Sequence, residues 1–212
     1  MYRVSVVIVA FNSESVIFDC LDSLIKFNDI GEDLEIIVVD NSKSNILEPL
    51  LASYDDASFS FKYAHNPTNG GFGQGNNVGV DNTSGDILLF LNPDTILVEP
   101  IFEELIRSVD QGFNIGGFRL VDLNFNDNDS IGLLPEYTWL SVPRSILLFL
   151  VRKSHVISKL VYPWGASLFV TRQSFLESGQ FDEQIFLCNE EPDLILLDVT
   201  MPLSYTAGIF TM

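Results

Sequence analysis

Short apolar runs alternate with segments of helical periodicity along the first half of the chain. Four runs predict buried strands: Val4–Phe11, Leu34–Val39, Phe59–Ala64 and Ile87–Leu91. The first of them is continuously apolar and rich in β-branched residues. Continuous apolar runs, rather than alternating ones, are typical of parallel strands covered on both faces. After the first run, apolar residues from Val16 to Ile25 recur at helical spacing, and Asn12–Ser15 are the expected helix cap. The pattern predicts a doubly wound α/β sheet flanked by helices.

The second half of the chain continues this pattern less regularly. A helix is predicted from about Glu99 to Asp110, a strand from Ile115 to Leu120, and a polar loop over residues 122–130. Residues 69–80 are rich in Gly and Asn, and this pattern alone predicts an irregular loop that is either plain or ligand-facing. No repeat or linker divides the 212 residues, so we expect one domain.

Polar side chains stand directly after three of the predicted strands. Asn12 follows the first strand, Asp40 and Asn41 follow the second, and Asn92 and Asp94 follow the fourth. In doubly wound sheets, ligands bind at the carboxyl ends of the strands, where the strand order switches. We therefore expect these residues to border one ligand site.

The charge of the chain restricts its partners. Lys and Arg number 11 against 29 Asp and Glu, which gives a net charge of −18. A field of that sign repels nucleic acids and anionic lipids at long range, so no nucleic-acid partner is expected. Binding of an anionic substrate would need a metal ion or backbone amides to offset the repulsion.

Several features predict a cytoplasmic protein. Cys20 and Cys188 match no metal-binding spacing and are interpreted as buried thiols in a reducing compartment. The N-terminus lacks the features of a secretory signal. The apolar run Ile146–Val151 is far shorter than the ~20 residues of a spanning helix.

Residues 144–159 leave two interpretations open. Arg144, Arg152, Lys153 and Lys159 surround the apolar run within this segment. The segment is either a helix packed on the sheet or an amphipathic patch that meets a lipid-linked acceptor or the inner face of the membrane.

Three motifs suggest chemistry. The glycines of residues 69–77 superficially resemble a dinucleotide-binding motif, but that motif directly follows the first strand, and these glycines do not. A nicotinamide-dependent oxidoreductase is therefore not expected. Asn92-Pro93-Asp94 places a carboxylate at a strand end, where Mg²⁺ or Mn²⁺ and a diphosphate could meet. Glu190-Glu191-Pro192-Asp193 groups acids near an expected helix start, where an ionised carboxylate could act as a general base. Taken alone, each motif also has a structural interpretation: an irregular loop for the glycines, a turn for Asn92-Pro93-Asp94, and a helix start for the acidic group.

Taken together and in this order, the motifs resemble family 2 glycosyltransferases, most closely the bacterial rhamnosyltransferase-like branch. The segments that carry the resemblance are Val4–Asn12, Ile36–Ser42, Asn69–Gly79, Ser84–Thr95, Trp164–Arg172, Gly179–Glu183 and Glu190–Leu194. The resemblance implies a GT-A fold with a doubly wound mixed sheet. It also implies a nucleotide-diphosphate sugar donor, Mn²⁺ or Mg²⁺, a saccharide or lipid-linked acceptor, and inversion at the anomeric carbon.

The same resemblance implies roles for individual residues. Asp94 would hold the metal and Glu191, where the family usually has Asp, would be the catalytic base. The donor would be bound by residues from five segments: Ala10, Phe11, Asn12, Asp40, Asn69, Gly70, Gly71, Asn92, Gly165 and Ala166. Residues 1–95 would form the nucleotide-sugar half and residues 96–212 the acceptor half, with the family's C-terminal part truncated. The alternative is a non-catalytic nucleotide-sugar-binding or assembly module, which would bind donor without turning it over.

Overall fold

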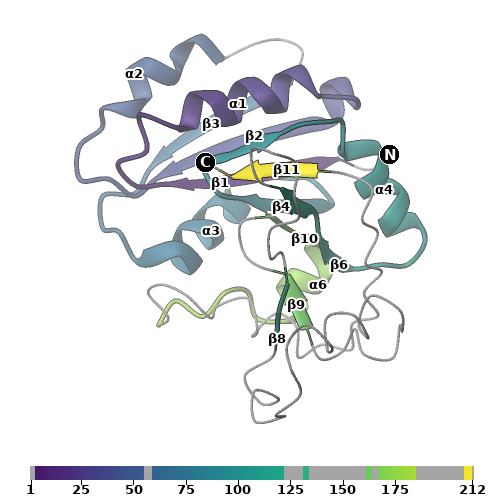
Figure 1. The fold of residues 1–212 in the computed structure, drawn as a ribbon. Coiled ribbons are helices and arrows are strands. Elements are labelled where there is room, and N and C mark those ends of the chain that lie inside the picture. Colours follow the sequence, from purple (N-terminus) through teal and green to yellow (C-terminus); the bar gives the residue numbers. More distant parts are fainter. Residues whose placement is uncertain are drawn as a thin grey trace.

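A six-stranded mixed sheet forms the centre of the protein in the computed structural model (Figure 1). The structure describes residues 3–54, 59–121, 131–133, 161–163, 167–184 and 208–211. The strand order is β3 (Ser60–His65), β2 (Leu34–Asp40), β1 (Val4–Ala10), β4 (Ile87–Leu91), β10 (Ser167–Thr171) and β6 (Ile115–Gly117). β1 to β4 are parallel, whereas β10 runs antiparallel to both β4 and β6. The predicted α/β sheet is confirmed.

Helices cover both faces of this sheet and create two hydrophobic cores. α1 (Ile17–Lys26), α2 (Leu47–Leu51) and α4 (Phe102–Asp110) pack on one face. α3 (Gly71–Asp81) and α6 (Arg172–Glu177) pack on the other, as Figure 1 shows for α3. Every residue of β1, β2 and β4 is buried, which explains their continuously apolar sequences. Two 3₁₀ turns, Gly31–Asp33 and Ala52–Tyr54, lead towards β2 and β3.

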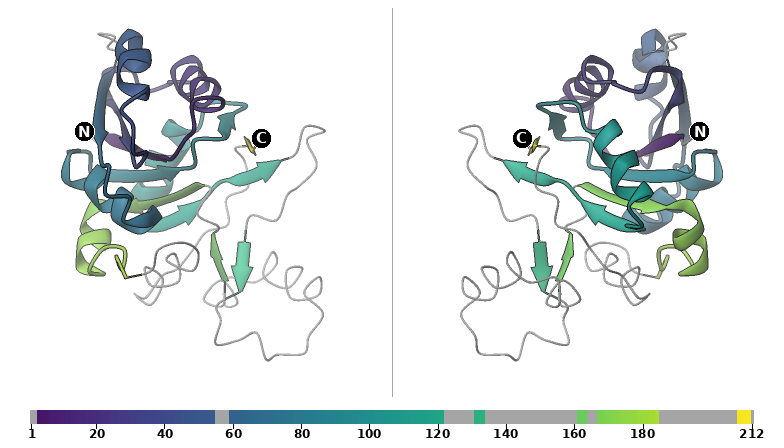
Figure 2. Two further views of the ribbon diagram at one scale, coloured as in Figure 1. Left: turned by 90° about the vertical axis from the view of Figure 1, so that its left-hand side faces the viewer. Right: turned by 90° about the vertical axis from the view of Figure 1, so that its right-hand side faces the viewer.

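Two smaller sheets lie to one side of the main sheet (Figure 2). The first has the order β5 (Thr95–Leu97), β11 (Gly208–Thr211) and β7 (Arg119–Val121). β11 runs antiparallel to β5 and parallel to β7. The second sheet is the antiparallel pair of β8 (Ile131–Leu133) and β9 (Val161–Pro163).

The prediction of an irregular glycine-rich loop is wrong, because residues 71–81 form helix α3. Its glycines allow the helix to approach the sheet closely. A Cβ at Gly75 would lie 2.8 Å from Val9 Cγ1, and one at Gly79 would overlap Val7 Cγ1. Glycine lowers intrinsic helix propensity, but here close packing on β1 outweighs that cost.

Two further predictions need correction. The single strand expected from Ile115 to Leu120 is divided into β6 and β7, which belong to different sheets. The residue between them, Phe118, is buried and packs against the Phe169 ring at 5.9 Å between centroids. The expected side-chain cap of the first helix is also absent, because the Ser13 hydroxyl accepts from the Phe11 N–H instead.

The predicted buried thiol of Cys20 is confirmed. The loop at 122–130, the basic segment 144–159 and Cys188 lie outside the described residues. Within the described ranges, no helix combines the length and apolar character needed to cross a membrane.

Candidate functional site

A cavity of about 610 Å³ opens at the carboxyl ends of β1, β2 and β4. Six of the predicted site residues line it: Phe11, Asn12, Asn69, Gly71, Asn92 and Asp94. These residues come from three segments that are distant in sequence, and the parallel register of β1 with β2 and β4 brings the strand ends together. Four of the five polar residues expected at these strand ends, Asn12, Asn41, Asn92 and Asp94, therefore border one cavity, whereas Asp40 does not line it.

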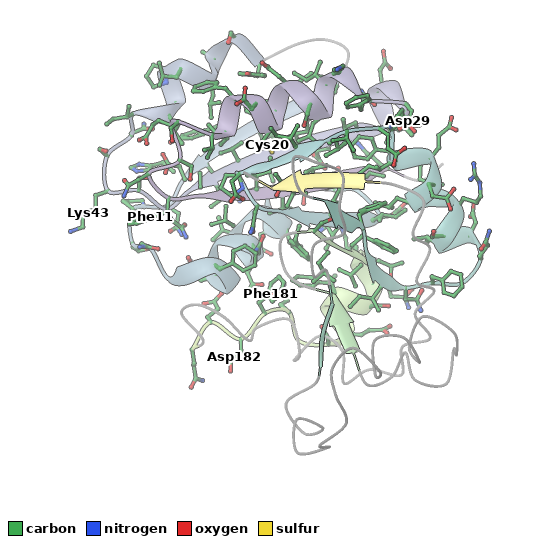
Figure 3. The ribbon with its side chains drawn as sticks, in the orientation of Figure 1. Phe11, Cys20, Asp29, Lys43, Phe181 and Asp182 are labelled. Atoms are coloured by element: carbon green, nitrogen blue, oxygen red, sulfur yellow. The ribbon has the colours of Figure 1, made fainter. Side chains whose placement is uncertain are left out.

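The loop after β1 presents an aromatic side chain at this cavity. Phe11 is 52% exposed, although it directly follows a fully buried strand. The next residue, Asn12, has a φ of 51°, and its N–H donates to Ser42 Oγ at 2.8 Å. Figure 3 shows Phe11 and Lys43 at the same end of the molecule. The loops after β1 and β2 are thus joined, and the Phe11 ring is left available for a ligand.

Asp40 lies below the cavity surface. Its side chain is fully buried, and its two carboxylate oxygens accept from the Ser42 N–H and the Tyr63 hydroxyl, both at 2.9 Å. Burial and the bond to Asp40 raise the pKa of Tyr63 well above its usual value. Ala10, Asp40 and Gly70 do not line the cavity, so their donor-binding roles stay predictions.

The side-chain amides of Asn41, Asn66 and Gln74 form a hydrogen-bonded network behind the cavity, and the sequence does not predict this network. Asn41, which lines the cavity, donates from Nδ2 to the Gly71 carbonyl at 3.0 Å. Asn66 Nδ2 donates to Asn41 Oδ1 at 2.7 Å and to Gln74 Oε1 at 2.6 Å. The network holds the start of α3 against the end of β2. Asn41 could be found from its place at a strand end, whereas Asn66 has no comparable sequence signal.

Asp94 stands in a turn between β4 and β5. The turn is closed by the Thr95 N–H, which donates to the Asn92 carbonyl at 3.2 Å. Beneath it, the Cys20 thiol contacts the same carbonyl, with a Sγ to oxygen distance of 3.8 Å. Burial and the nearby charge of Asp94 raise the pKa of Cys20 far above its usual value, so the thiol stays protonated.

The donor set at this turn is compatible with a hard divalent cation. Asn92 and Asp94 bring an amide and a carboxylate to the cavity. Among the residues that the structure describes, no group of three or more His, Cys, Asp or Glu could hold a metal by itself. Mg²⁺ and Mn²⁺ favour oxygen ligands, and Mg²⁺ usually keeps water and substrate phosphates in its shell, so one carboxylate can suffice. The residues fit a metal that binds together with a diphosphate.

Three predicted residues, Gly165, Ala166 and Glu191, lie outside the described residues. The described segment nearest in sequence to Glu191 is tied to α3. Asn77 donates to the Phe181 carbonyl at 3.0 Å and accepts from the Phe181 N–H at 3.2 Å. The Phe181 ring also packs edge-on against Phe72, which lines the cavity. Helix α3 therefore contacts both the cavity and the chain that leads to residue 185.

A mixed sheet with this cavity is the architecture of GT-A glycosyltransferases, and comparison with known proteins agrees. Residues 5–157 match the family described as glycosyl transferase family 2, and the chain belongs to that family.

Three individual proteins illustrate the similarity. The GalNAc(5)-diNAcBac-PP-undecaprenol beta-1,3-glucosyltransferase of Campylobacter jejuni is 24% identical over 88% of this chain and 57% of its own. The structure of S. aureus TarS 1–349 in complex with UDP-GlcNAc has a TM-score of 0.65 at 19% identity, over 99% of this chain and 58% of that one. The mannosyltransferase PcManGT of Pyrobaculum calidifontis, in complex with GDP-Man and Mn²⁺, has a TM-score of 0.67 at 12% identity, over 98% of this chain and 56% of that one. The chain therefore spans little more than half the length of each of these three proteins.

These similarities confirm the GT-A fold and the glycosyltransferase family. They do not single out the rhamnosyltransferase-like branch, because the similar proteins carry the names of other glycosyltransferases.

Proposed function

We propose that the protein is an inverting, metal-dependent glycosyltransferase that moves a sugar from a nucleotide diphosphate to a hydroxyl acceptor in cell-surface glycan synthesis. The observation that carries this proposal is the cavity in which Phe11, Asn12, Asn92 and Asp94 meet at the strand ends. Residues 1–95 would bind the nucleotide sugar, and residues 96–212 would bind the acceptor and supply the base.

In this proposal different residues at the cavity contact different parts of the donor. Phe11 and Asn12 border the nucleobase together with Ala10, and Asn69 and Gly71 line the donor at the start of α3. Asp94 holds Mn²⁺ or Mg²⁺, with Asn92 beside it. The bound cation would supply positive charge that offsets the charge developing on the departing nucleoside diphosphate.

Glu191 is the proposed base. It would accept the proton from the acceptor hydroxyl while the oxygen attacks the anomeric carbon from the side opposite the leaving nucleoside diphosphate. A single displacement of this kind inverts the anomeric centre without a covalent sugar–enzyme intermediate. Gly165 and Ala166 are proposed to lie under the sugar and the acceptor.

The acceptor is proposed to be a saccharide or a lipid-linked saccharide. The printed name of the Campylobacter relative refers to an undecaprenol-linked substrate, which supports the lipid-linked class. The basic residues of segment 144–159 would then meet an anionic membrane surface peripherally, on the cytoplasmic side. Flotation with anionic liposomes at low salt tests this contact, and a protein that stays at the bottom of the gradient would contradict it.

A transfer assay tests the chemistry. Purified protein is incubated with Mn²⁺, a panel of UDP- and GDP-sugars and saccharide acceptors, and release of nucleoside diphosphate is measured. Glu191→Gln should lower turnover by ~10²- to 10⁴-fold with donor affinity unchanged, because only the basic group is lost. Glu190→Gln is the matched control on the adjacent carboxylate. If Glu190→Gln abolishes turnover and Glu191→Gln does not, the base is assigned to the wrong residue.

The same assay distinguishes the second candidate, a non-catalytic binding module. The feature that favours the module is Glu191 itself, which stands where the family usually has Asp. Donor binding without turnover for any acceptor would support the module and contradict the enzyme.

A further inference from the structure

Helix α1 is attached to the turn that carries Asp94 at several points. Cys20 lies in the middle of α1 on the face that packs against the sheet, as Figure 3 shows. Its thiol contacts the Asn92 carbonyl and is also hydrogen-bonded by the backbone of Thr95. One sulfur atom therefore contacts both ends of the four-residue turn, and Asp94 lies between them.

Ser23, one helical turn further along α1, fixes the strand that follows. Its hydroxyl donates to the Cys20 carbonyl at 2.7 Å and accepts from the Leu97 N–H at 3.0 Å. Residues three apart on a helix lie on the same face, so Cys20 and Ser23 hold adjacent parts of one segment. Both side chains are buried, with exposed fractions of 0% and 5%.

We propose that Cys20 and Ser23 are positioning residues for Asp94, which set the geometry of the metal-binding turn from behind the cavity. The inference rests on the proposed function, because it assumes that Asp94 binds the cation. Neither residue lines the cavity, so neither would contact the donor or the metal directly. Their effect passes through the backbone of residues 92–97.

The chemistry of the two side chains suits this role. A small, soft thiol can accept from one backbone group and donate to another while it remains inside an apolar core. The Ser23 hydroxyl likewise has one donor and two acceptor sites, which lets it bridge the helix and β5. Outer groups that orient a metal ligand typically contribute about 10- to 100-fold to metal affinity.

The test measures binding rather than activity, with Mn²⁺ and UDP as probes. Mn²⁺ affinity in the presence of UDP is followed by electron paramagnetic resonance for wild type, Cys20→Ala, Cys20→Ser and Ser23→Ala. The control is Ile17→Val, which removes one buried methylene group from the same helix. Thermal unfolding of each variant shows how much stability it has lost.

We expect Cys20→Ala and Ser23→Ala each to weaken Mn²⁺ binding by about tenfold. Cys20→Ser should recover part of this loss, because its hydroxyl can still donate to the Asn92 carbonyl. Ile17→Val should bind Mn²⁺ like the wild type. In an Asp94→Ala background, Cys20→Ala should cause no further loss, which is the sign of coupling through Asp94.

Two failures are distinguishable. If wild type and Asp94→Ala bind Mn²⁺ equally in the presence of UDP, the metal assignment of the proposed function is wrong. If Asp94→Ala abolishes Mn²⁺ binding but Ser23→Ala and Cys20→Ser bind Mn²⁺ as tightly as Ile17→Val, the positioning role is overturned. Ser23→Ala and Cys20→Ser keep the test decisive even if Cys20→Ala does not fold.

Discussion

Phe11 shows how a single residue departs from its surroundings at the cavity. All seven residues of β1 before it are buried, yet its ring is half exposed beside the cavity. An exposed ring at this position can stack on a nucleobase, and stacking contributes about 1–3 kcal/mol per base. We predict that Phe11→Ala weakens UDP binding by about tenfold, whereas Phe11→Tyr retains it.

Isothermal titration with UDP measures this effect. Leu176→Ala is a suitable control, because Leu176 is also half exposed but lies on α6, away from the cavity. If Phe11→Ala binds UDP with the same affinity as the wild type, the Phe11 ring does not contribute to nucleotide binding.

The sequence identifies residues of the site where they directly follow a strand. Asn12, Asn92 and Asp94 could be predicted because each stands at the carboxyl end of an apolar run. Asn66 could not, because its role depends on contacts with Asn41 and Gln74 that form only after the chain has folded. Asp40 is predictable only in part. Its position at a strand end can be read from the sequence, but its hydrogen bond from the Tyr63 hydroxyl cannot.

Helix α3 depends on its glycines for its distance from the sheet. We predict that Gly79→Ala destabilises the protein by about 2 kcal/mol, because overpacking against Val7 outweighs the gain in helix propensity. Urea unfolding measures the change. Asp81→Ala, at an exposed position on the same helix, should change stability by less than about 0.5 kcal/mol. A Gly79→Ala variant as stable as wild type would show that the close packing can relax without cost.

The elements differ in how far they can be predicted, for a physical reason. β1, β2 and β4 are buried on both faces, so their sequences alone reveal them. β3 forms where a buried strand is predicted, but it is only partly buried because it lies at the edge of the sheet. The sequence does not reveal α3, because glycine usually indicates a loop. In α3 the glycines instead allow the helix to pack closely against β1. The division between β6 and β7 is missed because the chain stays apolar where Phe118 enters the core.

At the scale of the whole molecule, a buried carboxylate links the amino-terminal ends of the strands. Glu35 is 1% exposed and accepts from Lys62 Nζ, Ser5 Oγ and the Ser84 N–H. Burial alone would raise the pKa of Glu35, but these hydrogen bonds outweigh it and lower the pKa to about 2. The charged form therefore stabilises the fold.

The sign of this effect gives a pH prediction. Because the folded-state pKa is lowered from 4.5, the stabilisation is complete above about pH 5 and is lost as the pH falls towards 2. Glu35→Gln should lower the free energy of unfolding by about 2 kcal/mol at pH 7 and by roughly half as much at pH 3. Glu32→Gln, at an exposed position, is the control in urea titrations. Equal losses for Glu35→Gln at both pH values would contradict the charge-based account.

The central claim is that the cavity at the strand ends binds a nucleoside diphosphate through a cation at Asp94. Calorimetric titration of UDP, with and without Mn²⁺, tests it most directly in wild type and Asp94→Ala. We predict that Mn²⁺ tightens UDP binding to wild type by about tenfold or more and has no effect on a folded Asp94→Ala variant. UDP affinity that is the same with and without Mn²⁺, or a Mn²⁺ effect that survives Asp94→Ala, would contradict the account.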